Sequence, residues 1–215
     1  MNKTGRYAVR PLLRGACALA LLATLSGCVE MIVGGAVVGA MATADRRTYG
    51  AQTEDQAIAV KAEVRVPKIA GEGAHVNINS YNRRVLLTGE VKDEATKAAV
   101  QREVAAIEGV QAVANELEVS GVSSYTSRSS DTLLTTKVKA SLIEVKTISA
   151  NSFKVVSERG TVFLMGRVTM REGNVASDIA RSVRGVQKVV KVLDYITEEE
   201  LRTISVQPAA PAAKE

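Results

Sequence analysis

The feature that most constrains this chain is an internal repeat. Residues 85–91 (VLLTGEV) match residues 162–168 (VFLMGRV) at an offset of 77, and Gly109-Val110 matches Gly185-Val186 at 76. A fixed period of this kind predicts copies of one supersecondary module. We therefore expect two modules, at 54–119 and 130–197. Five positions upstream match at 76 as well: Asp55, Ile58, Lys61, Ala62 and Val66 with Asp131, Leu134, Lys137, Val138 and Leu142.

Both copies predict the same order of elements. Apolar residues spaced four apart, beginning at Ile58 and at Leu134, indicate an amphipathic first helix, and Ser130-Asp131 is a helix-cap pattern in the second copy. β-rich runs at 75–80 and 85–91, and at 152–157 and 161–168, are joined by turn-forming pairs and favour hairpins.

Each predicted hairpin is followed by a second helix, at 94–107 and 171–183, with Gly109 and Gly185 placed as C′ glycines. A final strand, at 110–119 and 186–196, completes an α-β-β-α-β unit. The fold class is therefore α+β, with two tandem modules in which two helices cover one face of a three-stranded sheet.

The first 27 residues have the pattern of a secretory signal. Positive charge without acidic residues precedes the apolar run 16–25, which is too short to span a membrane. The run ends in Leu-Ser-Gly-Cys at residues 25–28, which resembles the lipobox of bacterial lipoproteins. We expect acylation of Cys28 by N-acyl and S-diacylglycerol groups. An ordinary signal peptide with a chance cysteine is the alternative interpretation. An aspartate directly after the cysteine would resemble an inner-membrane retention signal of enterobacterial lipoproteins. Because Val29 stands there instead, we expect transport to the outer membrane.

Composition excludes several classes of function. Removing residues 1–27 takes away four positive charges and leaves a net charge of +1, so the basic whole-chain charge does not indicate nucleic acid. With Cys17 removed and Cys28 acylated, neither a disulfide nor a thiolate metal site can form. The single histidine, His75, alternates with Val76 and Ile78, so we expect it on the solvent face of a strand. We predict no metal, no other cofactor, no nucleic acid and no enzymatic activity.

The repeated motifs carry a family resemblance. A glycine after an apolar strand, then a helix, then Gly-Val-x-x-Val (GVQAV, GVQKV) is similar to the BON domain. Two such domains behind a lipobox resemble the dual-BON outer-membrane lipoproteins of the DolP family. The resemblance implies a non-enzymatic lipoprotein facing the periplasm, which binds anionic, phosphatidylglycerol-like phospholipid through its second module and supports outer-membrane integrity.

The two predicted modules differ in net charge. Residues 54–119 carry a net charge of −3, and residues 131–197 carry +5. On the first helix of the second module, one face should meet the sheet, while apolar Leu133 and Ile143 lie on a second face flanked by lysines, as in interfacial helices. The predicted phospholipid-binding residues are Leu133, Thr136, Lys137, Lys139, Ala140, Ile143 and Lys146. Alternatively, Leu133 and Ile143 pack against the other module or the linker.

The remaining segments have open interpretations. Residues 28–53 are the lipidated N-terminus and tether, and their Gly/Ala-rich part is either a flexible tether or a membrane-hugging segment. Residues 120–129 are a linker, and 198–215 are expected to be a disordered tail. Gly89 and Gly166 mark either a strand bend or a close approach to a ligand. The rival function is a protein–protein adaptor for outer-membrane assembly or cell-division machinery.

Overall fold

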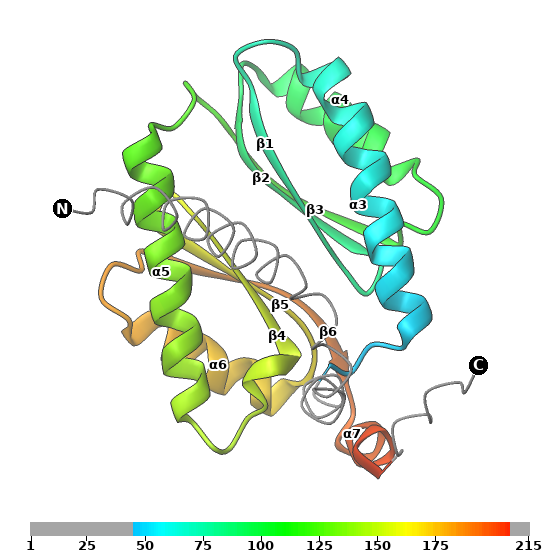
Figure 1. Cartoon of the computed structure of the whole chain (residues 1–215), viewed down its shortest axis with the longest axis vertical. Helices are drawn as coiled ribbons and strands as arrows, with labels where there is room; N and C mark the ends of the chain where they lie inside the picture. The colour runs from blue at the N-terminus through cyan, green and yellow to red at the C-terminus, as the bar shows by residue number, and fades with distance from the viewer. Residues whose placement is uncertain (1–44, 207–215) are drawn as a thin grey trace, which may run out of the picture. The chain divides into compact units, whose positions relative to one another are not determined.

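The computed structural model describes residues 45–206, which belong to one compact unit. The signal sequence at 1–27, Cys28 and the tether as far as residue 44 lie outside the described residues, as do residues 207–215. No helix in the described range is long and apolar enough to cross a membrane. The first module consists of α3 (Tyr49–Ala70), β1 (His75–Tyr81), β2 (Arg84–Val91), α4 (Glu94–Ala105) and β3 (Ala112–Val119) (Figure 1).

The second module repeats this order. It consists of α5 (Tyr125–Glu144), the short 3-10 turn η2 (Ala150–Ser152), β4 (Phe153–Glu158), β5 (Thr161–Thr169), α6 (Met170–Ser182) and β6 (Lys188–Ile196), followed by α7 (Glu198–Val206). In both three-stranded sheets the middle strand pairs antiparallel with the first strand and parallel with the last. The predicted α-β-β-α-β modules are confirmed.

Helix-to-sheet packing follows the apolar spacing of the first helices. Ile58, Ala62 and Val66 of α3 are buried against one side of the first sheet together with residues of α4. In the second module, Leu134, Val138 and Leu142 of α5 are buried against the second sheet in the same way, together with residues of α6. Figure 1 shows both helices of each module on the same face of their sheet.

One aspartate per module joins the first helix to the hairpin turn. Asp55 accepts hydrogen bonds from the backbone N–H groups of Asn82 and Arg83, at 2.7 and 2.8 Å. Asp131 does the same for Arg159 and Gly160, at 2.9 Å each. All four turn residues have positive φ, as a two-residue hairpin requires. Asp131 therefore acts inside the helix and not as the cap that the Ser130-Asp131 pattern suggested.

Gly89 and Gly166 allow neighbouring backbones to approach. A Cβ on Gly89 would lie 2.0 Å from the carbonyl oxygen of His75, and one on Gly166 would lie 2.4 Å from that of Ser152. No side chain fits at either distance. The close approach is therefore to the first strand in the first module, and to the residue immediately before the first strand in the second.

The first helix of each module begins before the predicted start of that module. Helix α3 begins at Tyr49, inside the predicted tether, and α5 begins at Tyr125, inside the predicted linker, because Thr48 and Ser124 cap them with their hydroxyls. Gly109 and Gly185 have positive φ, but they follow the helix caps Ala106 and Val183 by two or three residues.

Part of the predicted disordered tail is helical. Helix α7 occupies Glu198–Val206, and the Thr197 hydroxyl accepts a hydrogen bond from the backbone N–H of Glu200 at 3.0 Å. The carboxylate of Glu200 forms an ion pair with Arg167 of β5. An acidic first turn and a tertiary ion pair therefore stabilise a segment whose composition alone suggested disorder.

The two sheets pack against each other through the faces that carry no helices. Tyr81 and Leu86 of the first module form one buried cluster with Phe163 and Met165 of the second. His75 lies on this inner side, is partly buried and pairs with Glu90, so its predicted position on a solvent face was wrong. Alternation along β1 identified the correct face of the strand, but the second sheet covers that face.

The segment before α3 is fastened to the second module by a buried ion pair. The Arg46 guanidinium donates two hydrogen bonds to the Glu172 carboxylate, at 2.7 and 2.8 Å, and a third to the carbonyl of Arg167 at 3.2 Å. The side chains of Arg46 and Glu172 are 9% and 3% exposed. Burial acts to raise the pKa of Glu172, but the hydrogen bonds from Arg46 and from the N–H of Thr169 outweigh it and lower that pKa.

Candidate functional site

Helix α5 presents an outer face with two large, exposed apolar side chains. Its inner face is fixed by the buried residues Leu134, Val138 and Leu142. On the outer side Leu133 is 62% exposed and Ile143 is 68% exposed. Neither belongs to any of the three buried apolar clusters of the described chain. The structure therefore contradicts the alternative that Leu133 and Ile143 pack against the other module or the linker.

The other predicted members of this face are also solvent-exposed. Thr136, Lys137, Lys139 and Ala140 lie on the helix, and Lys146 follows its end, since the helix stops at Glu144 and is capped at Val145. Within residues 45–206 none of the three lysines forms an ion pair, so their ammonium groups are available to an external anion. We call Leu133, Thr136, Lys137, Lys139, Ala140, Ile143 and Lys146 the α5 outer face.

Several hydroxyl groups along α5 donate hydrogen bonds within the helix. The side chains of Ser129, Ser130, Thr132 and Thr136 each donate to the carbonyl four residues earlier, at 3.0 Å. Such back-bonding gives each hydroxyl hydrogen an acceptor within the helix, so that only the oxygen lone pairs still depend on water. The cost of moving this surface out of water is lowered accordingly.

Sequence reasoning missed Tyr125. It is the first residue of α5 and is 83% exposed, and the Arg128 guanidinium lies 4.7 Å from the centre of its ring. Tyr125 and Ile143 are separated by roughly five helical turns at 3.6 residues per turn, so they point to the same side of the helix. Tyrosine combines an apolar ring with a polar tip and suits a membrane interface. The Ser124 capping hydroxyl was the sequence signal that would have placed Tyr125 on the helix.

The equivalent helix of the first module offers a comparison. Val60 and Val64 of α3 are exposed to a similar degree as Leu133. The lysine and arginine side chains beside them are paired, Lys61 with Glu108 at 3.8 Å and Arg65 with Glu103 at 3.2 Å. The cations that flank Val60 and Val64 are therefore paired, and only Lys68, one turn after Val64, has no ion pair among the described residues of this helix.

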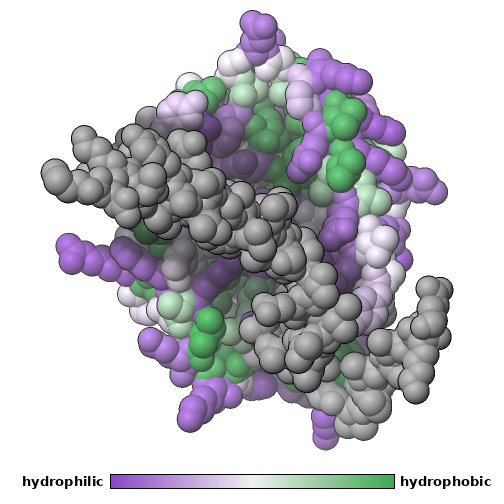
Figure 2. All heavy atoms as spheres, in the orientation of Figure 1, coloured by the Kyte–Doolittle hydropathy of each residue, from purple (hydrophilic) through white to green (hydrophobic). Residues whose placement is uncertain are grey.

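Exposed apolar groups are sparse on the face drawn in Figure 2. Hydrophilic side chains dominate the described residues in that view, and apolar ones form small separate spots. Singly exposed apolar residues are ordinary on protein surfaces. The combination with unpaired lysines, and not exposure alone, distinguishes the α5 outer face.

Comparison with known proteins identifies the family. Residues 54–121 and 130–197 match the BON domain. The chain is 41% identical to the outer membrane lipoprotein DolP of Haemophilus influenzae, over 86% of this chain and 97% of that protein. It is 32% identical to a 21 kDa hemolysin of Actinobacillus pleuropneumoniae, over 71% and 79% of the two chains.

A solved structure with a slighter likeness is the C-terminal domain of CdsD, a structural protein of the type III secretion system of Chlamydia trachomatis. It shares 9% identity over 61% of this chain and 96% of that domain, at a TM-score of 0.28. None of the matched names denotes a catalytic family. With two BON domains and high identity over most of its length, the chain belongs to the dual-BON outer-membrane lipoproteins of the DolP family.

Proposed function

We propose that this protein is held on the periplasmic side of the outer membrane by acyl chains on Cys28, and that its second module binds anionic phospholipid through the α5 outer face. Binding of this kind would support the integrity of the outer membrane. The observation that carries the proposal is the pairing of exposed Leu133 and Ile143 with lysines that have no partner in the described chain.

The expected energies are sufficient for reversible binding. Full burial of a Leu or Ile side chain is worth about 1.5–3 kcal/mol. Because Leu133 and Ile143 are each about two-thirds exposed, the pair would contribute about 2–4 kcal/mol on insertion. Each lysine near an anionic membrane surface adds about 1 kcal/mol, so three lysines account for about 3 kcal/mol. A tether at Cys28 would raise the local concentration of the module and make this modest affinity effective.

Charge asymmetry supports the choice of the second module. The first module has a net charge of −3 and the second +5. An anionic surface would attract the second module and repel the first at distances within a Debye length. This asymmetry favours one orientation of the protein on the membrane.

The test is flotation of a soluble fragment, residues 45–215, with liposomes. All three apolar clusters lie within this fragment, so it retains both cores. We expect it to float with vesicles that contain phosphatidylglycerol and not with purely zwitterionic vesicles, and we expect flotation to fall as salt rises. The double variant Leu133→Glu/Ile143→Glu should abolish flotation with an unchanged circular dichroism spectrum.

The matched control is Val60→Glu/Val64→Glu, which places the same charges on the equivalent helix of the first module. It should float like the unmodified fragment. No flotation of a folded fragment would refute the proposal, leave Cys28 as the sole source of membrane affinity and direct the search to outer-membrane assembly or cell-division proteins. Equal loss in both double variants would show that added negative charge, and not the α5 outer face, decides binding.

A further inference from the structure

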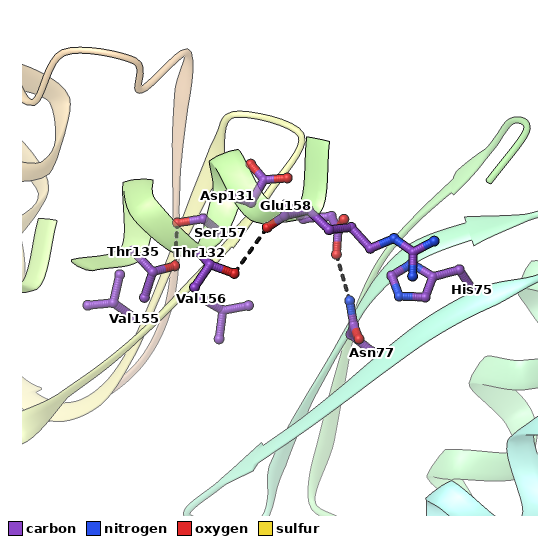
Figure 3. Close-up of a pocket in the computed structure, with 10 residues that line it drawn as sticks. His75, Asn77, Asp131, Thr132, Thr135, Val155, Val156, Ser157 and Glu158 are labelled. Carbon is purple, nitrogen blue, oxygen red and sulfur yellow. Dashed lines mark hydrogen bonds between the residues drawn. The ribbon is translucent and has the colours of Figure 1, made fainter. Parts of the chain in front are cut away.

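Three potential metal ligands meet where the two sheets pack together. His75 comes from β1, Glu90 from β2 and Glu158 from β4, so two belong to the first module and one to the second. Their nearest ligand atoms, one from each residue, all lie within 4.8 Å of one another. The closest pair is His75 Nδ1 and Glu90 Oε2 at 3.2 Å. Figure 3 shows His75 and Glu158 lining the pocket at this junction.

The spacing is close to that of a tetrahedral zinc site. Ligand atoms at about 2.0–2.2 Å from Zn²⁺ are separated from one another by roughly 3.3–3.6 Å in a tetrahedral site. The His75–Glu90 pair is already close to this separation, and a ligand atom of Glu158 lies within 4.8 Å of both. An imidazole nitrogen with two carboxylates favours a transition metal such as Zn²⁺ over Mg²⁺ or Ca²⁺, which select oxygen ligands alone.

Glu90 has an unmet requirement for positive charge. Its side chain is fully buried, and its Oε1 has no hydrogen-bond donor in the described chain. The nearest cation, Arg159 Nη1, lies 3.8 Å away and has closer partners in Ser120 Oγ at 2.6 Å and Glu118 Oε2 at 3.1 Å. A buried carboxylate oxygen without a hydrogen-bond donor is costly, and a cation bound between the two carboxylates would remove this cost.

The surroundings of Glu158 point the same way. Its side chain is also buried, and its carboxylate belongs to the same group of ligand atoms as that of Glu90. Two carboxylates therefore share a partly desolvated site, where they repel each other.

Hydrogen bonds from neighbouring side chains orient both carboxylates, and a cavity gives access to them. Asn77 Nδ2 donates to Glu158 Oε2 at 2.8 Å, and Ser123 Oγ donates to Glu90 Oε2 at 3.4 Å, so both carboxylates are oriented by neighbours. His75 and Glu158 face a cavity of about 360 Å³. This cavity provides an entry path and room for a water molecule as a fourth ligand.

We propose that His75, Glu90 and Glu158 bind one divalent transition-metal cation of the Zn²⁺ type, which would join the first module to the second. The proposal revises the sequence-based expectation that the chain binds no metal. That expectation rested on the absence of paired histidines and cysteines, and packing of the two sheets supplies the third ligand from the other module. The site is independent of the α5 outer face.

The test is isothermal titration calorimetry of the full mature chain in detergent, without an affinity tag, against zinc chloride. We expect one equivalent of Zn²⁺ to bind, and His75→Gln and Glu158→Gln each to weaken binding at least tenfold. The control is Glu118→Gln, which removes a nearby carboxylate that pairs with Arg159 but is not one of the three ligands. It should bind like the unmodified chain.

Cobalt gives a second readout of geometry. Co²⁺ bound at these residues should show the visible d–d absorption of a tetrahedral ion, and His75→Gln should lose it. Circular dichroism and thermal melting of the metal-free variants establish that they are folded. Absence of Zn²⁺ binding, or binding of equal strength in His75→Gln, Glu158→Gln and the unmodified chain, would overturn the proposal.

Discussion

Arg46→Ala should destabilise the protein by more than any exposed ion pair can account for. The substitution leaves the Glu172 carboxylate, which is 3% exposed, without its counter-charge and without two hydrogen bonds of 2.7 and 2.8 Å. Breaking a buried pair on one side typically costs about 3–5 kcal/mol. Because Glu172 still accepts a hydrogen bond from the N–H of Thr169, we expect the lower end, about 3 kcal/mol.

The assay is urea unfolding of residues 45–215, followed by far-ultraviolet circular dichroism and repeated as a thermal melt. A loss of about 3 kcal/mol corresponds to a fall of roughly 6–12 °C in Tm for a chain of this size. The matched control is Arg202→Ala. Arg202 pairs with Glu199, and both side chains are about three-quarters exposed, so this change should cost less than about 0.5 kcal/mol.

The Arg46–Glu172 ion pair also predicts how the stability of the fold changes at low pH. The pKa of Glu172 is lowered in the folded state from its usual value of 4.5, so its stabilising contribution is fully present above about pH 4.5 and is lost as the pH falls through the folded-state pKa. In Arg46→Ala this part of the acid destabilisation should shrink. The double variant Arg46→Ala/Glu172→Gln should recover part of the lost stability, because no buried charge remains. If Arg46→Ala and Arg202→Ala unfold at the same urea concentration, the ion pair does not fasten the N-terminal segment in solution.

Three further predictions follow from single residues. Asp55→Ala should cost about 3–5 kcal/mol and Asp131→Ala about 2–3, measured by urea unfolding, because Asp55 accepts four hydrogen bonds and Asp131 two; equal costs would contradict this. Gly166→Ala should destabilise by more than about 2 kcal/mol in a thermal melt, since its Cβ would strike a backbone oxygen, while Gly121→Ala, with open space, should be neutral. Tyr125→Ser should weaken binding to phosphatidylglycerol vesicles about threefold to tenfold in flotation, and unchanged flotation would remove Tyr125 from the contact surface.

The repeat and its apolar spacing predicted most of the fold. Ile58 and Leu134 were placed on helices facing a sheet because residues at this spacing share one helix face, and both are buried. Local patterns of this kind determine which face is apolar. The repeated Gly89 and Gly166 likewise predicted a special backbone position, although the structure was needed to identify the neighbouring backbone that approaches each glycine.

What the sequence did not predict depends on contacts between the modules. The face of β1 that carries His75 looks solvent-exposed within one module and is covered only by the second sheet. A sequence signal for this packing exists in β5, where Val162, Phe163, Leu164 and Met165 are apolar in succession, a pattern typical of a strand buried on both faces. The ligand set at Glu90 and Glu158 could not be predicted, since no local pattern specifies which strands of separate modules meet.

The helix-to-turn aspartates have a consequence for the order of folding. Each contact closes a chain segment of fewer than thirty residues, from Asp55 to Asn82-Arg83 and from Asp131 to Arg159-Gly160. Short loops are closed at low entropic cost, and local contacts speed folding. Each module can therefore organise its first helix and hairpin before the other exists. During synthesis or export, the first module would fold first, and the sheet of the second module would then pack against the sheet that is already formed.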